Sequence, residues 1–189
     1  MKLIIKVIEK NPTIVLTFAF EMSITKQHTV WLSLGSNLGD RSLNLKNARD
    51  AIRLAGNRII SVSGIYESSP WGYNSEHSFY NQCIEVRSSL DPLNVLLLIK
   101  DIERTAGRER VEGSYSDRTL DIDILFYDDL VMDTGDLSIP HPLMKDRYFV
   151  LYPLNEIAAE KKHPVWHKTV SEFLETCPDE GTIRRLPDK

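Results

Sequence analysis

Two helix-length segments, each lying between two strand-like segments, constrain the fold of this chain more than any other feature. The first carries one apolar stripe at helical spacing, formed by Leu45, Ala48, Ile52 and Ala55. It is expected to begin after Asp40 or Ser42, either of which can cap a helix. The second is the apolar run 93–102, which follows Asp91-Pro92, a capping carboxylate and a proline suited to the first turn. The sequence therefore predicts two helices.

The surrounding segments have the alternation or the β-branched composition of strands. They are residues 30–34, 59–66, 79–87 and 119–127. The polar, glycine-containing segments 67–78 and 108–117 are expected to be loops. Strand, helix and strand thus occur twice, which is the α+β, ferredoxin-like plan: an antiparallel sheet with both helices on one face. RNA-binding modules share this plan, so it does not decide function.

The two ends of the chain lie outside this pattern. A late helix is expected in the tail after residue 128, from the spacing of Val170, Phe173, Leu174 and Cys177. Near the start, the apolar run 14–20 is too short to span a bilayer, which takes about 20 residues, and Glu9 and Glu21 on either side of it do not fit a signal peptide. We interpret residues 1–27 as an extension, with Met22 as an alternative start. An added edge strand or helix is the second interpretation, and a targeting segment the third. Residues 28–189 then form a single domain.

Charge and cysteine content exclude some functional classes. The formal net charge of -4 argues against a general nucleic-acid binder, which is usually basic. Cys83 and Cys177 are far apart and lack CxxC spacing, so neither a disulfide framework nor a zinc motif is indicated. We expect a protein of the reducing cytoplasm, with neither nucleic acid nor a membrane as its partner.

Two acidic residues alternate with apolar ones in the last predicted strand. The apolar side chains, expected to point together into the core, are Leu120, Ile122, Ile124 and Phe126. Asp121 and Asp123 then share the opposite face, with Cα atoms about 6.6 Å apart. Two carboxylates this close repel each other unless a cation lies between them, and magnesium prefers carboxylate and phosphate oxygens. The pair predicts a magnesium site; the alternative is a solvated strand face whose charges deter edge pairing.

Basic side chains surround the acidic pair in the sequence. They are Arg108, Arg110 and Arg118 before it, and His141 and Arg147 after it. The planar guanidinium suits phosphate oxygens, so acids beside several arginines indicate a metal–polyphosphate site. Acidic residues are interleaved, which leaves a surface ion-pair network as the alternative: Glu103, Glu109, Glu112 and Asp117. The turn 35–41 carries glycines between a strand and a helix, but it lacks the P-loop pattern.

The third predicted strand offers a different kind of contact. Phe79 and Asn81 are two residues apart and therefore share a face. An aromatic ring can stack on a flat heterocycle, and an amide can both donate to its edge and accept from it. The alternative is a packed phenylalanine and an asparagine bonded to backbone.

Taken in order, these and several neighbouring motifs resemble the 6-hydroxymethyl-7,8-dihydropterin pyrophosphokinases. The motifs are LGSNLGDR at 34–41, YESSPWG at 66–72, FYN at 79–81, GRER at 107–110, RTLDID at 118–123, IPHP at 139–142 and RYF at 147–149. They occur in the family's order, and the ordered set is highly specific although each motif alone is modest evidence.

The resemblance implies transfer of the β,γ-diphosphate of ATP to the pterin's hydroxymethyl oxygen, with release of AMP, in folate biosynthesis. It implies two magnesium ions on Asp121 and Asp123, with Arg108 and Arg118 as further catalytic residues. The expected ATP contacts are Glu103, Arg108, Arg110, Arg118, His141 and Arg147. The expected pterin contacts are Ser68, Trp71, Phe79, Asn81 and Phe149, with the two phenylalanines on opposite faces of the ring. The family's polar loops close over the substrates, and we expect a monomer.

The segment before Arg118 departs from the family's usual pattern. Ser116-Asp117 stands where the family usually has a small residue and then proline, and Tyr115 stands where relatives often carry tryptophan. The extra carboxylate could pair with one of the phosphate-binding arginines in the open state.

Two other functions are alternatives. One is another metal-dependent phosphoryl-transfer or phosphate-hydrolysing enzyme, which would not need the aromatic residues. The other is a non-catalytic ferredoxin-like module that binds RNA, whose phosphates the acids on the sheet would repel. Only the pyrophosphokinase requires ATP-dependent pterin binding.

Overall fold

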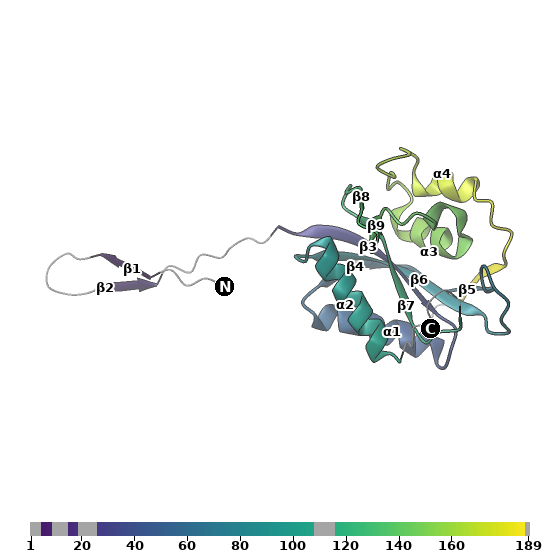
Figure 1. Cartoon of the computed structure of the whole chain (residues 1–189), viewed down its shortest axis with the longest axis horizontal. Helices are drawn as coiled ribbons and strands as arrows, with labels where there is room; N and C mark the ends of the chain where they lie inside the picture. The colour runs from purple at the N-terminus through teal and green to yellow at the C-terminus, as the bar shows by residue number, and fades with distance from the viewer. Residues whose placement is uncertain (1–4, 9–14, 19–25, 108–115, 188–189) are drawn as a thin grey trace.

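Six strands form the central sheet of the structure, a computed structural model that describes residues 5–8, 15–18, 26–107 and 116–187. The strands are β3 (His28–Ser36), β4 (Arg58–Val62), β5 (Tyr66–Ser68), β6 (Phe79–Ser88), β7 (Asp121–Tyr127) and β10 (Ile183–Arg185). Their order is β10-β5-β6-β3-β7, with β4 also paired to β6, and these pairings are antiparallel. Helices α1 (Arg41–Leu54) and α2 (Pro92–Thr105) cover one face (Figure 1). The predicted ferredoxin-like α+β fold is confirmed.

Both of these helices begin where their capping residues predict. The side chain of Asp40 accepts a hydrogen bond from Leu43 N at 3.0 Å, so Asp40 rather than Ser42 caps α1. The side chain of Asp91 accepts from a backbone N–H in the first turn of α2 at 3.0 Å, and Pro92 is the first residue of that helix. The two caps satisfy backbone donors that a helix leaves without partners at its start.

The sheet carries an apolar core on each face. The first core packs the sheet against α1 and α2 and includes Leu34, Leu45, Ile99 and Ile122. The second lies on the opposite face and includes Cys83, Leu151, Leu154 and Phe173. Helices α3 (Tyr148–Ala158) and α4 (Val170–Glu175) cover this second face (Figure 1). The sheet is therefore a middle layer between two helical layers.

One helix of the second layer was predicted and one was not. The late helix is present as α4, although it ends at Glu175, before Cys177. The sequence did not indicate α3, because Pro153 stands inside it and its near-continuous apolar run hides the helical period.

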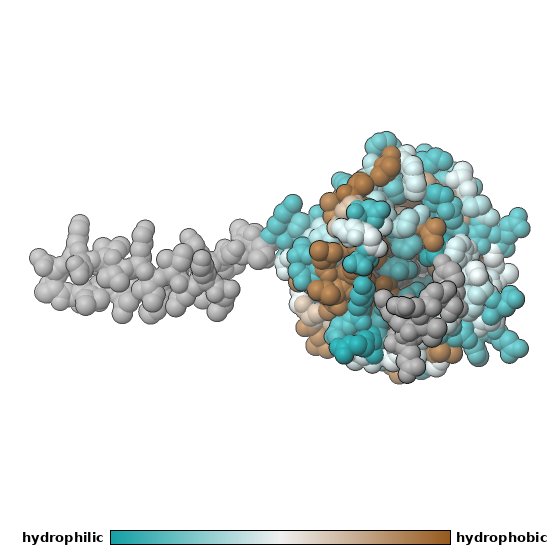
Figure 2. Space-filling view, viewed as in Figure 1, coloured by the Kyte–Doolittle hydropathy of each residue, from teal (hydrophilic) through white to brown (hydrophobic). Residues whose placement is uncertain are grey.

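Smaller elements complete the described residues. The strands β8 (Met132–Asp133) and β9 (Ser138–Ile139) pair with each other, and the 3-10 turn η1 (Met144–Asp146) precedes α3. The strands β1 (Ile5–Ile8) and β2 (Val15–Phe18) form a two-stranded sheet of their own. Within the described part of the chain, no helix is long and apolar enough to cross a membrane. Figure 2 shows apolar side chains gathered over α2, which carries the exposed Leu93 and Leu97.

The strand predicted at residues 59–66 is two strands, β4 and β5. Both pair with the long strand β6, but residues 63–65 between them are not in strand conformation. Two hydrogen bonds hold this interruption: Cys83 N donates to Ser63 Oγ at 3.0 Å, and Gly64 N donates to Glu156 on α3 at 3.0 Å. These partners are distant in sequence, so local composition could not reveal the break.

Phe126 points away from the core that the alternation predicted for it. Trp31 pairs with Phe126 and Leu32 with Ile124, so Leu125 is an extra residue in β7, a β-bulge. The bulge shifts the alternation by one, and both Leu125 and Phe126 join the second core. The prediction that Phe126 lies with Ile122 and Ile124 is therefore wrong, whereas Leu120, Ile122 and Ile124 do share the first core.

Two leucines on α1 provide a matched test of this packing. Leu45 is fully buried, whereas Leu54 is 88% exposed. We expect Leu45→Ala to lower the free energy of unfolding by about 2–5 kcal/mol through lost burial and a residual cavity. Leu54→Ala should change it by less than about 0.5 kcal/mol. Urea unfolding followed by circular dichroism measures both, and equal effects would contradict the assigned helix orientation.

Candidate active site

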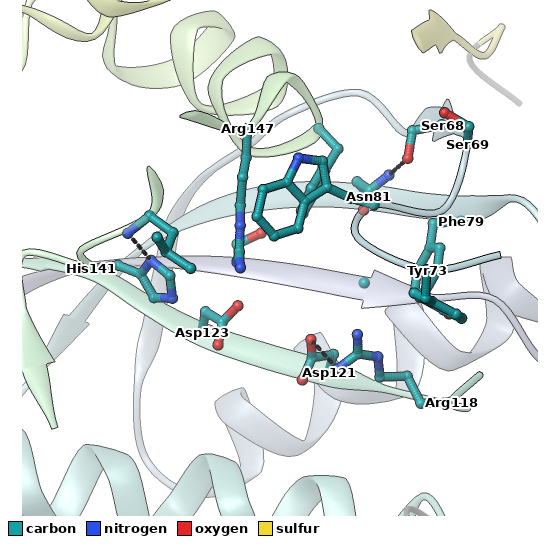
Figure 3. A pocket seen from close by; sticks show the side chains of 15 residues that line it. Ser68, Ser69, Tyr73, Phe79, Asn81, Arg118, Asp121, Asp123, His141 and Arg147 are labelled. Atoms are coloured by element: carbon teal, nitrogen blue, oxygen red, sulfur yellow. Dashed lines mark hydrogen bonds and ion pairs between the residues drawn. The ribbon is translucent and has the colours of Figure 1, made fainter. Parts of the chain in front are cut away.

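A cavity of about 290 Å³ lies on the sheet face opposite α1 and α2 (Figure 3). It is bordered by β7, β3 and β6 and by the start of α3. The five residues expected to contact the pterin all line it: Ser68, Trp71, Phe79, Asn81 and Phe149. Five of those expected to bind metal or phosphate line it as well: Arg118, Asp121, Asp123, His141 and Arg147. The fold thus gathers residues from five separate sequence motifs.

The register of three strands forms the floor of this cavity. Gly35 of β3 pairs with Asp121 of β7 on one side and with Asn81 of β6 on the other. A Cβ at Gly35 would lie 3.6 Å from Asn81 Oδ1 and 4.0 Å from Asp121 Cβ. The missing side chain therefore leaves the floor open between an acid and an amide.

Asp121 and Asp123 both face the cavity, as the alternation predicted (Figure 3). Asp121 Oδ2 pairs with Arg118 NH1 at 3.0 Å. Burial and the neighbouring charge of Asp121 raise the pKa of Asp123 well above its usual range, with Arg147 opposing the rise. Negative charge at Asp123 is thus costly until a cation approaches.

The donor chemistry of this pair fits magnesium. Both side chains offer hard carboxylate oxygens, which magnesium prefers, and both face the same cavity. Within the described ranges, no group of three or more His, Cys, Asp or Glu side chains is placed to hold a metal ion. Protein ligands would therefore number few, which suits an ion that keeps waters and shares phosphate oxygens with a substrate.

A second cavity, of about 380 Å³, adjoins the first beyond the edge strand β7. Asp121, Asp123 and His141 border both cavities, and Lys100 and Glu103 of α2 line the second. Glu103 is 3% exposed, and its Oε1 accepts a hydrogen bond from Ile122 N at 2.8 Å. Glu103 thus fixes α2 against the acid-bearing strand.

His141 is held neutral between the two cavities. Its Nδ1 accepts a hydrogen bond from Leu143 N at 3.2 Å, which places the ring proton on Nε2. Burial, and next the charge of Arg147, lower the pKa of His141 to about 4, with Asp121 opposing them. At neutral pH this side chain is a hydrogen-bond donor without charge.

The sequence model of the 7,8-dihydro-6-hydroxymethylpterin-pyrophosphokinase (HPPK) family matches residues 31–159. The chain belongs to this family. It is 39% identical over 145 residues to the 2-amino-4-hydroxy-6-hydroxymethyldihydropteridine pyrophosphokinase of Aquifex aeolicus, covering 77% of this chain and 89% of that protein. It is 42% identical over 159 residues to the folic acid synthesis protein FOL1 of Dictyostelium discoideum, covering 84% of this chain and 24% of that protein. The chain therefore spans about a quarter of the Dictyostelium protein and most of the Aquifex one.

Solved structures give the same fold. A crystal structure of a triple mutant of Plasmodium falciparum HPPK-DHPS matches with a TM-score of 0.64 at 21% identity. The match covers 82% of this chain and 45% of that chain. Its HPPK domain supports the ferredoxin-like assignment.

Aromatic side chains form the walls of the first cavity in this HPPK-family chain. The ring centroids of Trp71 and Phe149 lie 6.4 Å apart, and the guanidinium carbon of Arg147 lies 4.4 Å from the Trp71 ring. Asn81 is 2% exposed and its Nδ2 donates to Ser68 Oγ at 2.9 Å (Figure 3). The amide orientation is therefore fixed at the edge of a flat, aromatic-walled slot.

Asp117, which departs from the family's pattern, connects three loops. Its Oδ1 accepts from Asn37 Nδ2 at 2.7 Å and from Tyr73 OH at 3.0 Å, and its Oδ2 lies 3.9 Å from His77 Nε2. Burial raises the pKa of Asp117, but hydrogen bonds from Ser75, Asn37 and Tyr73 outweigh it and lower the pKa. Asp117 thus joins its own loop to the loop predicted at 67–78 and to the turn 35–41. The expected pairing with an arginine stays a prediction, because Arg108 and Arg110 lie outside the described residues.

Some cavity residues were not found from the sequence. Tyr73, Ser33 and Leu143 line the cavity, although no motif or periodicity singled them out. Ser33 could have been found from the sequence, because aligning the two central strands β3 and β7 pairs it with Asp123. Tyr73 lies in a loop without periodicity and carried no such signal.

The charge state of His141 can be measured directly. We expect its imidazole to titrate near pH 4 in NMR spectra of the folded protein, because burial and the positive charge of Arg147 disfavour protonation. Arg147→Gln should raise this pKa while leaving it below 6.5, because burial is the larger cause. Titration of wild-type His141 near 6.5 would contradict the buried, neutral arrangement.

Proposed function

We propose that this chain transfers the β,γ-diphosphate of ATP to the hydroxymethyl oxygen of 6-hydroxymethyl-7,8-dihydropterin, releasing AMP, in folate biosynthesis. One observation carries the proposal: Asp121 and Asp123 border two adjoining cavities, one walled by aromatic rings and one formed beside α2. A transfer between two bound substrates needs a shared border where developing charge is stabilised. Membership of the HPPK family supports the same reaction.

The pterin is assigned to the first cavity. Phe79 and Phe149 provide the faces for stacking, with Trp71 beside Phe149. Asn81 is positioned by Ser68 to read the polar edge of the heterocycle. The hydroxymethyl group would then extend toward the acids.

The nucleotide is assigned to the second cavity. Its phosphates are assigned to the border between the two cavities, where Asp121 and Asp123 lie. Glu103 and His141 belong to this side, and Arg118 and Arg147 face the acids from the first cavity. Arg118 NH1 pairs with Asp121 Oδ2, and the buried Nε of Arg118 has no partner among the described residues. Its remaining donors suit phosphate oxygens. Arg108 and Arg110 are proposed as further triphosphate contacts from outside the described residues.

Two magnesium ions are proposed at Asp121 and Asp123, and when bound they supply positive charge that offsets the phosphate oxygens during transfer. Asp121 and Asp123 hold them at the border of the cavities, and neutral His141 donates a hydrogen bond without competing for the site. The hydroxymethyl oxygen releases its proton to solvent and bonds to the β-phosphorus, and the bond from that phosphorus to the α–β bridging oxygen breaks. The bridging oxygen leaves with AMP. No side chain is assigned as general base.

We further propose that the protein is a cytoplasmic monomer. Residues 28–189 would form one domain, with residues 1–27 as an extension. Size-exclusion chromatography with light scattering tests the oligomeric state, and a dimer would overturn it.

The direct test is AMP release from ATP and magnesium, with and without 6-hydroxymethyl-7,8-dihydropterin. AMP should form only with the pterin and should stop when EDTA removes the metal. ADP or orthophosphate in its place would mean a different phosphoryl transfer. Folded protein that forms no nucleotide product would remove the enzymatic proposal.

The acid pair gives a sharper prediction. Asp123→Asn should reduce AMP release by at least about 100-fold, because it removes a metal-binding carboxylate at the point of charge development. The fold should persist, since the substitution also removes the repulsion between buried acids. Asp129→Asn, at a side chain 84% exposed, is the matched control. An active Asp123→Asn enzyme, or one inactive through unfolding, would count against the metal role.

A further inference from the structure

The last described segment of the chain, residues 179–186, lies against the outside of the aromatic cavity; we call it the C-terminal strap. Its strand β10 extends the sheet by pairing with β5. Just before that strand, Ser69 N donates to Thr182 O at 3.2 Å. The strap lies beyond residues 31–159, which match the family's sequence model, so that match assigns it no role.

Asp179 joins the strap to α3. Its Oδ2 accepts a hydrogen bond from Tyr148 N at 3.0 Å, and its Oδ1 accepts from Gly181 N at 2.8 Å. Arg147, the N-cap residue of α3, makes no side-chain capping bond. The strap therefore supplies the acceptor that a helix ordinarily receives from its own cap. Gly181 suits this approach, because a Cβ there would lie 2.9 Å from Asp179 Oδ1.

The two hydrogen bonds that the strap makes across the cavity wall end beside two aromatic residues. Tyr148 directly precedes Phe149, and Ser69 stands two residues before Trp71. The rings of Phe149 and Trp71 have centroids 6.4 Å apart. A narrow space of about 30 Å³ lies at this junction, lined by both rings and by strap residues. The C-terminal strap thus bonds to the backbone beside each of the two rings, at Tyr148 and at Ser69.

Ion pairs hold the strap to the same two elements independently of Asp179. Arg185 NH2 lies 3.1 Å from Glu156 Oε1 of α3, and Arg184 NH2 lies 2.6 Å from Glu67 Oε2 of β5. Gly64 makes room for the first pair, since a Cβ there would lie 2.7 Å from Arg185 Nε. Because these contacts persist without Asp179, its replacement should loosen the start of α3 without detaching the strap.

We propose that the C-terminal strap sets the separation of Trp71 and Phe149, and that Asp179 is a positioning residue for pterin binding. The proposal rests on the proposed function, because it assigns the aromatic slot to the pterin. The strap contacts described here reach α3 and β5, whereas the second cavity is formed by α2, residues 121–124 of β7 and residues within 135–142. Loss of the Asp179 bond should therefore weaken pterin binding more than ATP binding, which involves the start of α3 only through Arg147.

The test compares three variants of the full chain by steady-state AMP release. Asp179→Ala should raise the KM for the pterin about tenfold, as expected when a binding wall loses its preorganisation. The KM for ATP and kcat should each change less than the KM for the pterin does, because Arg147 is the proposed ATP contact that adjoins the start of α3. Asp179→Asn keeps one acceptor oxygen and should recover most of the pterin affinity. Glu180→Ala removes the same charge from the adjacent, exposed position and should match wild type.

The outcomes separate the two proposals. Active wild type with an unchanged pterin KM in Asp179→Ala would overturn the role of the strap and leave the proposed function standing. Equal loss in Asp179→Ala and Glu180→Ala would overturn it too, because charge alone would then explain the effect. A uniform fall in kcat, with both KM values unchanged, would indicate fewer folded molecules and would likewise overturn it. Wild type that releases no AMP would overturn the proposed function and, with it, this inference.

Discussion

The pairing of β3 with both of its neighbours is the constraint on which the rest of the structure depends. Gly35 lies between Asp121 and Asn81 because β3 meets β7 and β6 in one register. A slip of one residue in either pairing would turn polar site residues into the first core and apolar residues outward. The hydrophobic faces of the strands therefore fix the register, and the register places an acid, an open floor and an amide in one row. Packing and chemistry are specified by the same alternation.

Electrostatics explains why that row is suited to catalysis rather than to stability. Two neighbouring carboxylates on a half-buried face repel each other, and burial together with this repulsion raises the pKa of Asp123. A protein optimised for stability alone would replace one of them. The second cavity, with Glu103 holding α2 to β7, keeps the acids between two binding spaces. In the proposed reaction, cations that arrive with the substrate phosphates would offset this repulsion.

The sequence predicted the parts of this fold that repeat locally and missed those that depend on distant partners. The strand alternation, including that around Asp121 and Asp123, was sufficient to predict the sheet and its acid-bearing face. The caps at Asp40 and Asp91 were sufficient to predict where its two helices begin. The bulge at Leu125 was not predictable, because the sequence of β7 alone does not show which of its residues will have no pairing partner on β3. The break between β4 and β5 likewise depends on Glu156 of α3, far along the chain. In the site, ordered motifs indicated ten of the lining residues, whereas Tyr73 entered through a loop whose conformation Asp117 and Asn37 determine.

The bulge at Leu125 has a consequence for how ligands and folding are coupled. One face of the sheet carries the cavity at one end and the second core at the other, with α3 spanning both, and the bulge adds Phe126 to that core. The first turn of α3 carries Phe149, and the following turns place Leu151 and Leu154 in the second core. Any molecule that binds the native aromatic slot and not the unfolded chain therefore adds its binding free energy to the stability of the fold. An inhibitor of this cavity would raise the melting temperature of the protein, and a weakened second core would in turn reduce the inhibitor's apparent affinity.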